Sequence, residues 1–166
     1  MKWLIILLSG LSAYGVNAQE APHHFRVEDG QAVWRARLDS AAVPSDYLAR
    51  LKKDIFEDVQ DRPGGISGNL KYVAPMYSEA GYQWVTTTIF LLRHLVSGYA
   101  TVEFDGGFYN ITVRKIVFMK PSGGKVETLE EVNVNRKGNF KPGFRNCDGR
   151  VLHVTFSKLF GVAFVK

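Results

Sequence analysis

The side chains that could do chemistry are few, and the most suggestive cluster is Cys147, Asp148 and His153. A thiol beside a base and an orienting acid is the arrangement of nucleophilic catalysis. Residues 150–156, however, alternate like a strand, which places His153 on a polar face rather than beside Cys147. We therefore interpret Cys147 as a free structural thiol and assign no catalytic residue.

The histidines and acidic residues form no metal or hydrolase motif. The histidines lie at positions 23, 24, 94 and 153, without HExxH spacing, and no carboxylate or cysteine is spaced to complete a site around the first two. The acidic residues gather on predicted helices, where solvent exposure and the helix dipole account for them. A pair of carboxylates distant in sequence, as in glycoside hydrolases, stays open as an alternative. We expect no metal and no cofactor.

Residues 1–18 have the features of a secretory signal peptide. Lys2 supplies the positive charge, residues 3–8 the short apolar region, and residues 16–18 a small-residue cleavage site. The apolar run is much shorter than the roughly 20 residues that span a bilayer, and a retained membrane anchor is the alternative. No cysteine follows it, so we do not expect a lipoprotein. The sequence predicts an exported protein, periplasmic or extracellular, with no transmembrane segment after signal cleavage.

Length and composition favour one domain in residues 26–166, after a flexible leader at residues 19–25. The chain is 46% hydrophobic and 13% aromatic, which suffices for a core, and its lone cysteine excludes an intramolecular disulfide. The formal net charge of +5 comes from basic residues scattered along the chain rather than from one dense patch. We therefore expect no nucleic-acid partner.

The middle of the chain mixes helix and strand patterns. Residues 43–59 follow the helical period, with Ser45 as the expected N-cap. Residues 66–73 predict a strand. Residues 81–92 are rich in β-branched and aromatic side chains and also predict a strand, with a buried helix over 89–96 as the alternative.

The segment 100–118 predicts a β-hairpin. The apolar side chains of its two arms meet on one side only if the loop has two residues, either Gly106-Gly107 or Asp105-Gly106. The alternation changes parity at residues 116–118, which indicates either a bulge or a strand covered on both faces.

The last third predicts a short helix and two strands. Thr128 and Glu131 have the spacing of a capping box, and Gly138 is the expected end of that helix. Residues 150–156 and 161–165 predict the final strands.

One predicted surface could serve recognition. Residues 31–39 alternate like a half-buried strand, with an apolar face that includes Trp34 and a polar face that carries arginines. The polar face of the hairpin adds further candidates. The candidate binding residues are Arg35, Arg37, Tyr99, Thr101, Asn110 and Arg114. Tyrosine and arginine are enriched in binding hot spots, although an ordinary solvent-facing strand surface also looks like this.

The order of these landmarks resembles a family of exported hypothetical proteins from Bacteroidetes, whose domain of unknown function has a fold like that of the TATA-binding protein (TBP-like). The resemblance covers most of residues 25–164 and rests on the stretches "VEDGQAVWRARLDS", "ISGNL", "AGYQWVTTTIFLL", "YATVEFDGGFYNITVRKIVF", "ETLEE", "NFKPGF" and "VLHVTF". It implies a single α+β domain, with a curved, mainly antiparallel sheet and two helices packed on one side. It brings no active site, and a fold does not carry function, so DNA binding is not implied.

A second resemblance is to the C-terminal domain of TonB-type energy transducers, on "NLKY", "SEAGYQ", "FKPG" and "VLHVTF". That domain pairs with the edge of outer-membrane receptors by strand addition. This chain has no transmembrane anchor after cleavage and no proline-rich spacer, so the resemblance implies envelope protein binding rather than energy transduction.

We expect a non-enzymatic binding module for an envelope protein or glycan, acting through a sheet face or a sheet edge. A cofactor-free hydrolase and a structural subunit of an exported assembly are the alternatives. The oligomeric state stays open.

Overall fold

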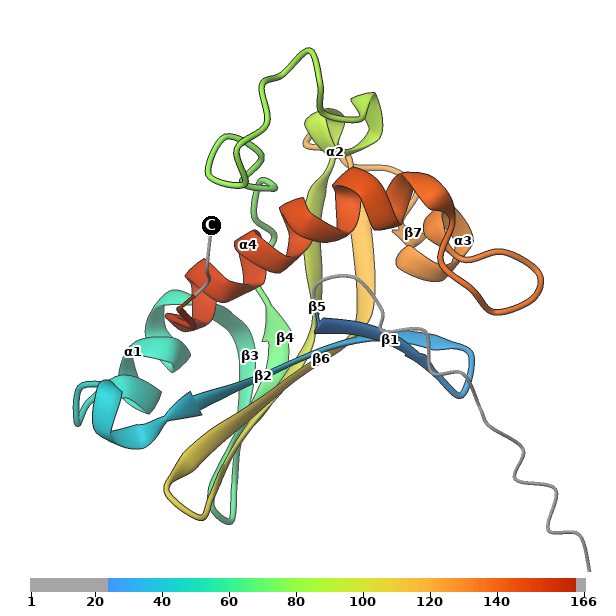
Figure 1. Cartoon of the computed structure of the whole chain (residues 1–166). Helices are drawn as coiled ribbons and strands as arrows, with labels where there is room; N and C mark the ends of the chain where they lie inside the picture. The colour runs from blue at the N-terminus through green and yellow to red at the C-terminus, as the bar shows by residue number, and fades with distance from the viewer. Residues whose placement is uncertain (1–23, 164–166) are drawn as a thin grey trace, which may run out of the picture.

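Antiparallel strands dominate the structure, a computed structural model that describes residues 24–163. Seven strands among these residues form one open, curved sheet in the order β1-β2-β6-β5-β4-β3, with β7 paired to β6 (Figure 1). The strands are β1 (Phe25–Glu28), β2 (Gln31–Asp39), β3 (Phe56–Arg62), β4 (Gly65–Leu70), β5 (Leu95–Asp105), β6 (Phe108–Met119) and β7 (Glu127–Thr128). The helices are α1 (Tyr47–Asp54), α2 (Ile89–Arg93), α3 (Leu129–Asn133) and α4 (Gly149–Phe160), with a 3-10 turn η2 (Ser40–Ala42) and a π-helical turn η3 (Phe144–Asp148). The chain is a single α+β domain, as predicted; the predicted signal peptide lies outside the described residues.

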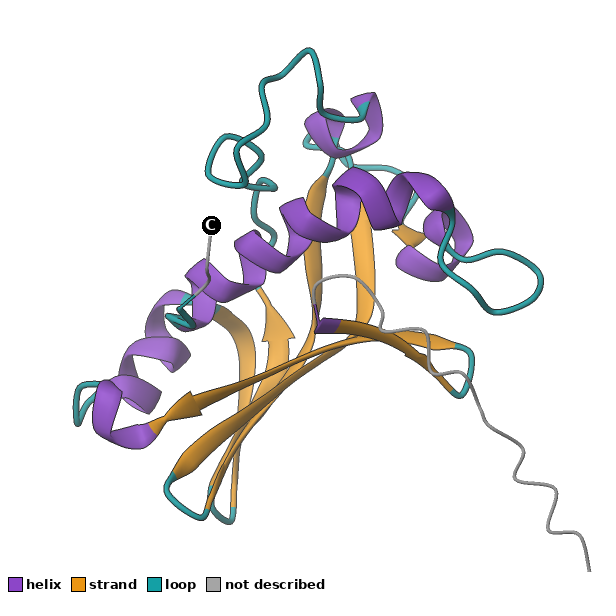
Figure 2. Cartoon of the chain, viewed as in Figure 1, coloured by secondary structure: helices purple, strands orange, loops and turns teal. Residues whose placement is uncertain are grey.

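The helices lie on one side of the sheet (Figure 2). The long helix α4 runs across that side and α1 packs near its end, which confirms the predicted arrangement of helices on one face. Trp34 of β2 is fully buried between the layers, with ring centroids 5.5 Å from Phe156 and 6.1 Å from Phe160 of α4. The hydroxyl of Tyr47 in α1 donates a hydrogen bond to the Phe160 carbonyl over 2.8 Å. The apolar core therefore fills the space between the sheet and α4.

The hairpin β5–β6 confirms the expected two-residue loop. Asp105 pairs with Phe108, so Gly106 and Gly107 form the turn. Their φ values of 56° and 88° lie in the left-handed region that a type I′ turn requires and that glycine adopts without steric cost. As expected, the apolar side chains of the two arms lie on the same side of the sheet.

The change of parity in β6 is a β-bulge. Tyr99 pairs with Arg114, but Ser97 pairs with Val117, so β6 has one residue more than β5 at this point. Lys115 lies in the bulge with φ 48°, a conformation that non-glycine residues rarely adopt. The bulge returns the apolar residues beyond it to the core side, which explains the break in alternation.

A second irregularity lies in β3. Phe56 pairs with Leu70 and Asp58 with Asn69, so Glu57 is an extra residue in the edge strand. β3 was not predicted as a strand: the helical prediction for 43–59 is too long, because α1 ends at Asp54. Residues 56–62 pair with β4 instead and form the edge strand of the sheet. The N-cap of α1 is Asp46 rather than Ser45, and its side chain makes no capping hydrogen bond.

The predicted strand at residues 81–92 is wrong. Residues 74–88 form turns and loop, and Ile89–Arg93 form α2, as in the helical alternative. The β-branched residues at 85–88 fit a strand by composition, but both neighbours of β5 in the sheet are already occupied by β4 and β6. Tertiary context therefore overrides the local preference.

The predicted capping box of α3 is confirmed, but the helix is shorter than expected. The Thr128 hydroxyl accepts a hydrogen bond from the Glu131 backbone over 3.2 Å, and the Glu131 carboxylate accepts one from the Thr128 backbone over 2.8 Å. The helix ends at Asn133 rather than near Gly138. The side chain of Asn135 explains this, because it accepts backbone hydrogen bonds within the following turn and competes with helical pairing.

The predicted strand at 150–156 is also wrong, and this error matters most for the fold. These residues belong to α4, which spans Gly149–Phe160. Leu152, Phe156 and Phe160 recur every four residues and are all fully buried, so the helical period was present beneath the β-branched composition. In the predicted strand 161–165, residues 161–163 are not in a strand, and the rest lie outside the described residues.

Candidate binding face

The sheet face opposite α4 carries the polar residues singled out from the sequence. We call it the open face, because no helix of the described residues covers it (Figure 2). Arg35 pairs with Thr112, which pairs with Thr101 on the next strand, and Arg37 pairs with Asn110. The register therefore brings all six candidate residues to this one face: Arg35, Arg37, Tyr99, Thr101, Asn110 and Arg114.

The arginines of the open face make only shallow contacts. Arg35 contacts the Glu28 carboxylate at 2.7 Å, and Arg114 approaches the same oxygen at 4.0 Å. The guanidinium of Arg37 stacks over the ring of Phe108, 3.7 Å from its centroid. All three arginines are exposed, so these contacts position the side chains without using up their capacity to bind a partner.

Tyr99 forms a small hydrogen-bond network in the middle of the open face. Its hydroxyl donates to the Ser67 hydroxyl over 3.0 Å and accepts from Arg62 over 3.2 Å. The hydrogen bond with Ser67, helped by the nearby Arg62 charge, lowers the pKa of the Tyr99 phenol. The network holds the Tyr99 ring in one orientation on the open face.

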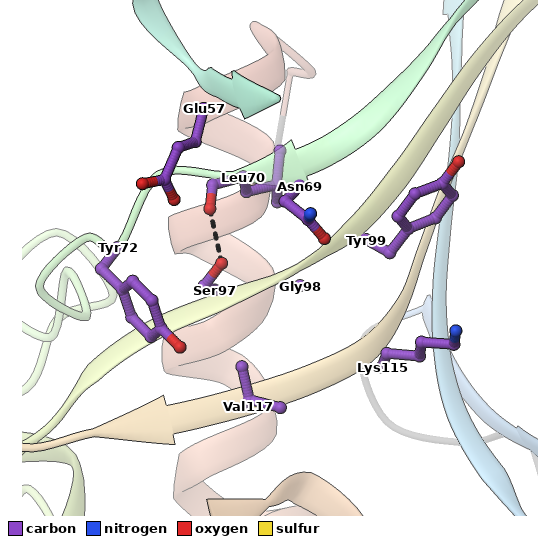
Figure 3. A pocket seen from close by; sticks show the side chains of 9 residues that line it. All are labelled: Glu57, Asn69, Leu70, Tyr72, Ser97, Gly98, Tyr99, Lys115 and Val117. Atoms are coloured by element: carbon purple, nitrogen blue, oxygen red, sulfur yellow. Dashed lines mark hydrogen bonds between the residues drawn. The ribbon is translucent and has the colours of Figure 1, made fainter. Parts of the chain in front are cut away.

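A hollow of about 350 Å³ lies at one end of the open face, next to Tyr99 (Figure 3). Figure 3 shows Glu57 and Tyr72 at one end of the hollow and Tyr99 and Lys115 at the other. The strands β4 and β5 form its floor, where the Ser97 hydroxyl donates to the Leu70 carbonyl over 2.5 Å. The remaining lining residues are Asn69, Gly98 and Val117. We call this hollow the bulge pocket.

The two bulges explain why charged side chains line this pocket. Asp58, Asn69, Tyr99 and Arg114 form one row of paired residues across four strands. Asp58 and Arg114 are the two ends of that row. Glu57 precedes Asp58 in the chain and lies in the bulge of β3, and Lys115 follows Arg114 and lies in the bulge of β6. A bulge takes a residue out of the regular alternation and re-aims its side chain.

The bulge pocket was not predicted from the sequence. The break of parity after Lys115 was the one signal of it, and that signal did not point to Glu57. The helical pattern assigned to residues 43–59 hid the second bulge, because it placed Glu57 on the solvent side of a helix.

The cluster of Cys147, Asp148 and His153 does not form a nucleophilic site. Nδ1 of His153 accepts a hydrogen bond from the Trp34 indole over 3.2 Å, whereas the Cys147 thiol lies 3.9 Å from the Thr86 carbonyl. Burial and the neighbouring Asp148 raise the pKa of the Cys147 thiol, which disfavours the reactive thiolate.

Asp148 is a buried carboxyl that accepts one hydrogen bond, from the Thr88 hydroxyl over 2.8 Å. Burial raises the pKa of Asp148, and the hydrogen bond from Thr88 partly offsets that shift. Among the described residues, His, Cys, Asp and Glu side chains nowhere gather in a group of three that could hold a metal ion. Within residues 24–163, no helix has the length and apolar character needed to cross a membrane.

A second exposed surface lies in the loop before α2. Trp84, Val85 and Ile89 are 69%, 60% and 66% exposed, which is unusual for large apolar side chains. Tyr82 anchors this loop by donating from its hydroxyl to the Asn146 carbonyl over 2.9 Å. The patch lies apart in sequence from the strands of the open face.

No protein-family model matches the chain, and neither does any functionally characterised protein sequence. Among solved structures, the chain is similar to a DUF4468 family protein from Bacteroides ovatus. The two share 13% sequence identity and align over 84% of each chain, with a TM-score of 0.45.

Proposed function

We propose that this protein is a non-enzymatic binding module that recognises an envelope protein or glycan through its open face. The observation that carries the proposal is that α4 and α1 cover one side of the sheet, while the other presents a tyrosine and three arginines in shallow contacts. Such side chains combine apolar area with hydrogen-bond donors, which suits them to binding hot spots.

Binding through the face is better supported than strand addition at an edge. The edge strand β3 carries Glu57, Asp58, Asp61 and Arg62, all exposed. Charged side chains along an edge discourage pairing with another chain. At the other edge, β1 has only four residues and offers a short template.

A hydrolase has less support than a binding module. The Cys147 thiol has a raised pKa, Nδ1 of His153 accepts a hydrogen bond from the Trp34 indole, and the Asp148 carboxyl accepts one from the Thr88 hydroxyl. The open face does present titratable groups in the bulge pocket, but these carry opposite charges suited to binding.

The proposal includes export by the segment at residues 1–18 and kinship with the exported Bacteroidetes family of TBP-like fold. Both rest on the sequence patterns alone. An intact-mass measurement on protein recovered from cells tests export, since cleavage after Ala18 leaves a chain that begins at Gln19. A mass that retains residues 1–18 would contradict it.

Binding through the open face is tested by capture with paired charge variants. The protein, an Arg35→Gln/Arg114→Gln variant and an Arg50→Gln/Lys53→Gln variant are immobilised and challenged with envelope proteins and glycans of the organism that makes the protein. The last variant removes the same charge from α1, where both side chains are exposed away from the open face. The lost pairs with Glu28 are surface contacts, so both variants should fold.

We expect a partner that the α1 variant retains and the open-face variant loses. Circular dichroism and urea midpoints establish that all three proteins are folded equally. A partner retained equally by both variants would refute the open face as the binding surface. Turnover of a substrate by the purified protein would refute the non-enzymatic proposal.

A further inference from the structure

We infer that the bulge pocket binds a short peptide with a free N-terminus and a free C-terminus, with the ammonium at Glu57 and the carboxylate at Lys115. This deepens the proposed function, because Tyr99 belongs to both the open face and the pocket. It rests on that proposal only for its biological setting and is tested separately.

Glu57 and Lys115 are both exposed and are available to a ligand. The ion pairs of the described residues involve neither Glu57 nor Lys115, and neither side chain takes part in a hydrogen bond there. They lie at opposite ends of the pocket (Figure 3). A ligand with one positive and one negative end would match both charges, whereas an anion or a cation alone would meet repulsion at one end.

The backbone at Lys115 supports a built site. A lysine with φ 48° is strained where glycine would not be, and such strain tends to persist where it positions a functional group. The two bulges lie at one level of the sheet, so Glu57 and Lys115 flank the same hollow. Two independent irregularities of the sheet thus converge on one pocket.

The spacing selects a peptide rather than a single amino acid. Glu57 and Lys115 are separated by three strand spacings, about 14 Å between backbones at roughly 4.8 Å each. Both side chains are exposed, and turning them toward each other would shorten this gap. An extended chain spans about 3.3–3.6 Å per residue, so two or three residues would then fit. The pocket volume of about 350 Å³ is at the lower end for ligand sites and agrees with that size.

The uncharged lining suits the body of a peptide. The amide of Asn69 lies between the two ends and can hydrogen-bond to a peptide group (Figure 3). Tyr72 and Tyr99 offer aromatic surface at either end, and Val117 adds apolar contact for a ligand side chain.

Calorimetric titration with blocked and unblocked dipeptides tests the inference. The probes are alanyl-alanine, its N-acetyl derivative and its C-terminal amide, used with the full chain. Acetylation removes the ammonium and amidation removes the carboxylate. Because each end would lose one ionic contact with an exposed side chain, we expect each blocking group to weaken binding about 2- to 5-fold.

Matched variants assign each end of the ligand. Glu57→Gln should remove the effect of acetylation and keep that of amidation, and Lys115→Met should do the reverse. Glu103→Gln on the open face and Lys120→Met beyond β6 change the same charges outside the pocket, so they should leave both effects intact.

The outcomes separate this inference from the proposed function. Equal binding of blocked and unblocked dipeptides, or no binding of any dipeptide at millimolar concentration, overturns the inference. In either case, capture that depends on Arg35 and Arg114 would still support the open face. Dipeptide binding with the expected variant pattern supports the pocket, even if the capture experiment fails.

Discussion

Gly68 is the position where one added methyl group should cost the most. It lies in β4, paired with Val59 of the edge strand β3. A Cβ atom built there would lie 1.7 Å from the Asp58 carbonyl oxygen and 2.9 Å from the Val59 Cα. Gly68→Ala therefore cannot be accommodated by a side-chain rotation, because the obstacle is backbone.

The size of the effect follows from the distance. Contacts under 3.0 Å are essentially absent for Cβ atoms, so β3 must move away by roughly 1.3 Å. A shift of that size breaks two or three ladder hydrogen bonds, each worth about 1 kcal/mol. It also loosens the buried Phe56, whose burial contributes about 1.5–3 kcal/mol. We expect Gly68→Ala to lower the free energy of unfolding by about 3–5 kcal/mol.

Gly143 supplies the matched control. It has φ −58° and ψ −41°, a helical conformation, and an added Cβ would meet no atom within 4 Å. Gly143→Ala should therefore raise the free energy of unfolding by about 0.4–1 kcal/mol, because alanine restricts the unfolded chain. The same chemical change should thus act with opposite sign at the two positions.

Urea denaturation followed by tryptophan fluorescence measures both variants, because the buried Trp34 changes its environment on unfolding. The midpoint should fall for Gly68→Ala and rise slightly for Gly143→Ala, with the dependence on urea unchanged. A Gly68→Ala protein within 0.5 kcal/mol of the parent would refute the close approach of β3 and β4. Equal effects at the two glycines would do the same.

Two further substitutions test the buried polar groups by the same urea assay. Tyr47→Phe should cost about 1–2 kcal/mol, since the Phe160 carbonyl loses its buried donor; a cost below 0.5 kcal/mol would contradict this. Asp148→Asn should be more stable than the parent at pH 7, because burial raises the carboxyl pKa in the folded state and so penalises the ionised form, while an amide oxygen can still accept from Thr88. This advantage should shrink as the pH falls toward 3.8, the ordinary value for the group, and an advantage that grew on acidification would show that the sign is wrong.

Local patterns predicted the parts of the fold whose pairing partners lie nearby. The parity of Val102 and Ile111 predicted a two-residue loop without any knowledge of the rest of the sheet, and the structure has Gly106-Gly107 of the two pairs that the parity allowed. The prediction failed for α4, where Val151, Val154 and Thr155 favour a strand locally. The large buried surface of Trp34, far away in sequence, needs a helix to cover it instead.

The open face was predictable and the bulge pocket was not, for a physical reason. Alternation within a strand is enough to place Arg35 and Arg37 on one face. The pocket depends on Glu57 and Lys115 leaving the alternation in two different strands at the same level of the sheet. That coincidence is a property of the register, which no single stretch of sequence encodes.

The position of α4 across the sheet constrains the order of folding. Trp34 hydrogen-bonds to His153, and Tyr47 to Phe160, so the core joins segments more than a hundred residues apart. The hairpin β5–β6 can form locally and early. Its apolar side remains exposed to solvent until α4, which ends at residue 160, is available to cover it. Such late, non-local closure slows folding and leaves an apolar sheet surface exposed during synthesis. The sheet and α4 should therefore pack together only once the whole domain is available.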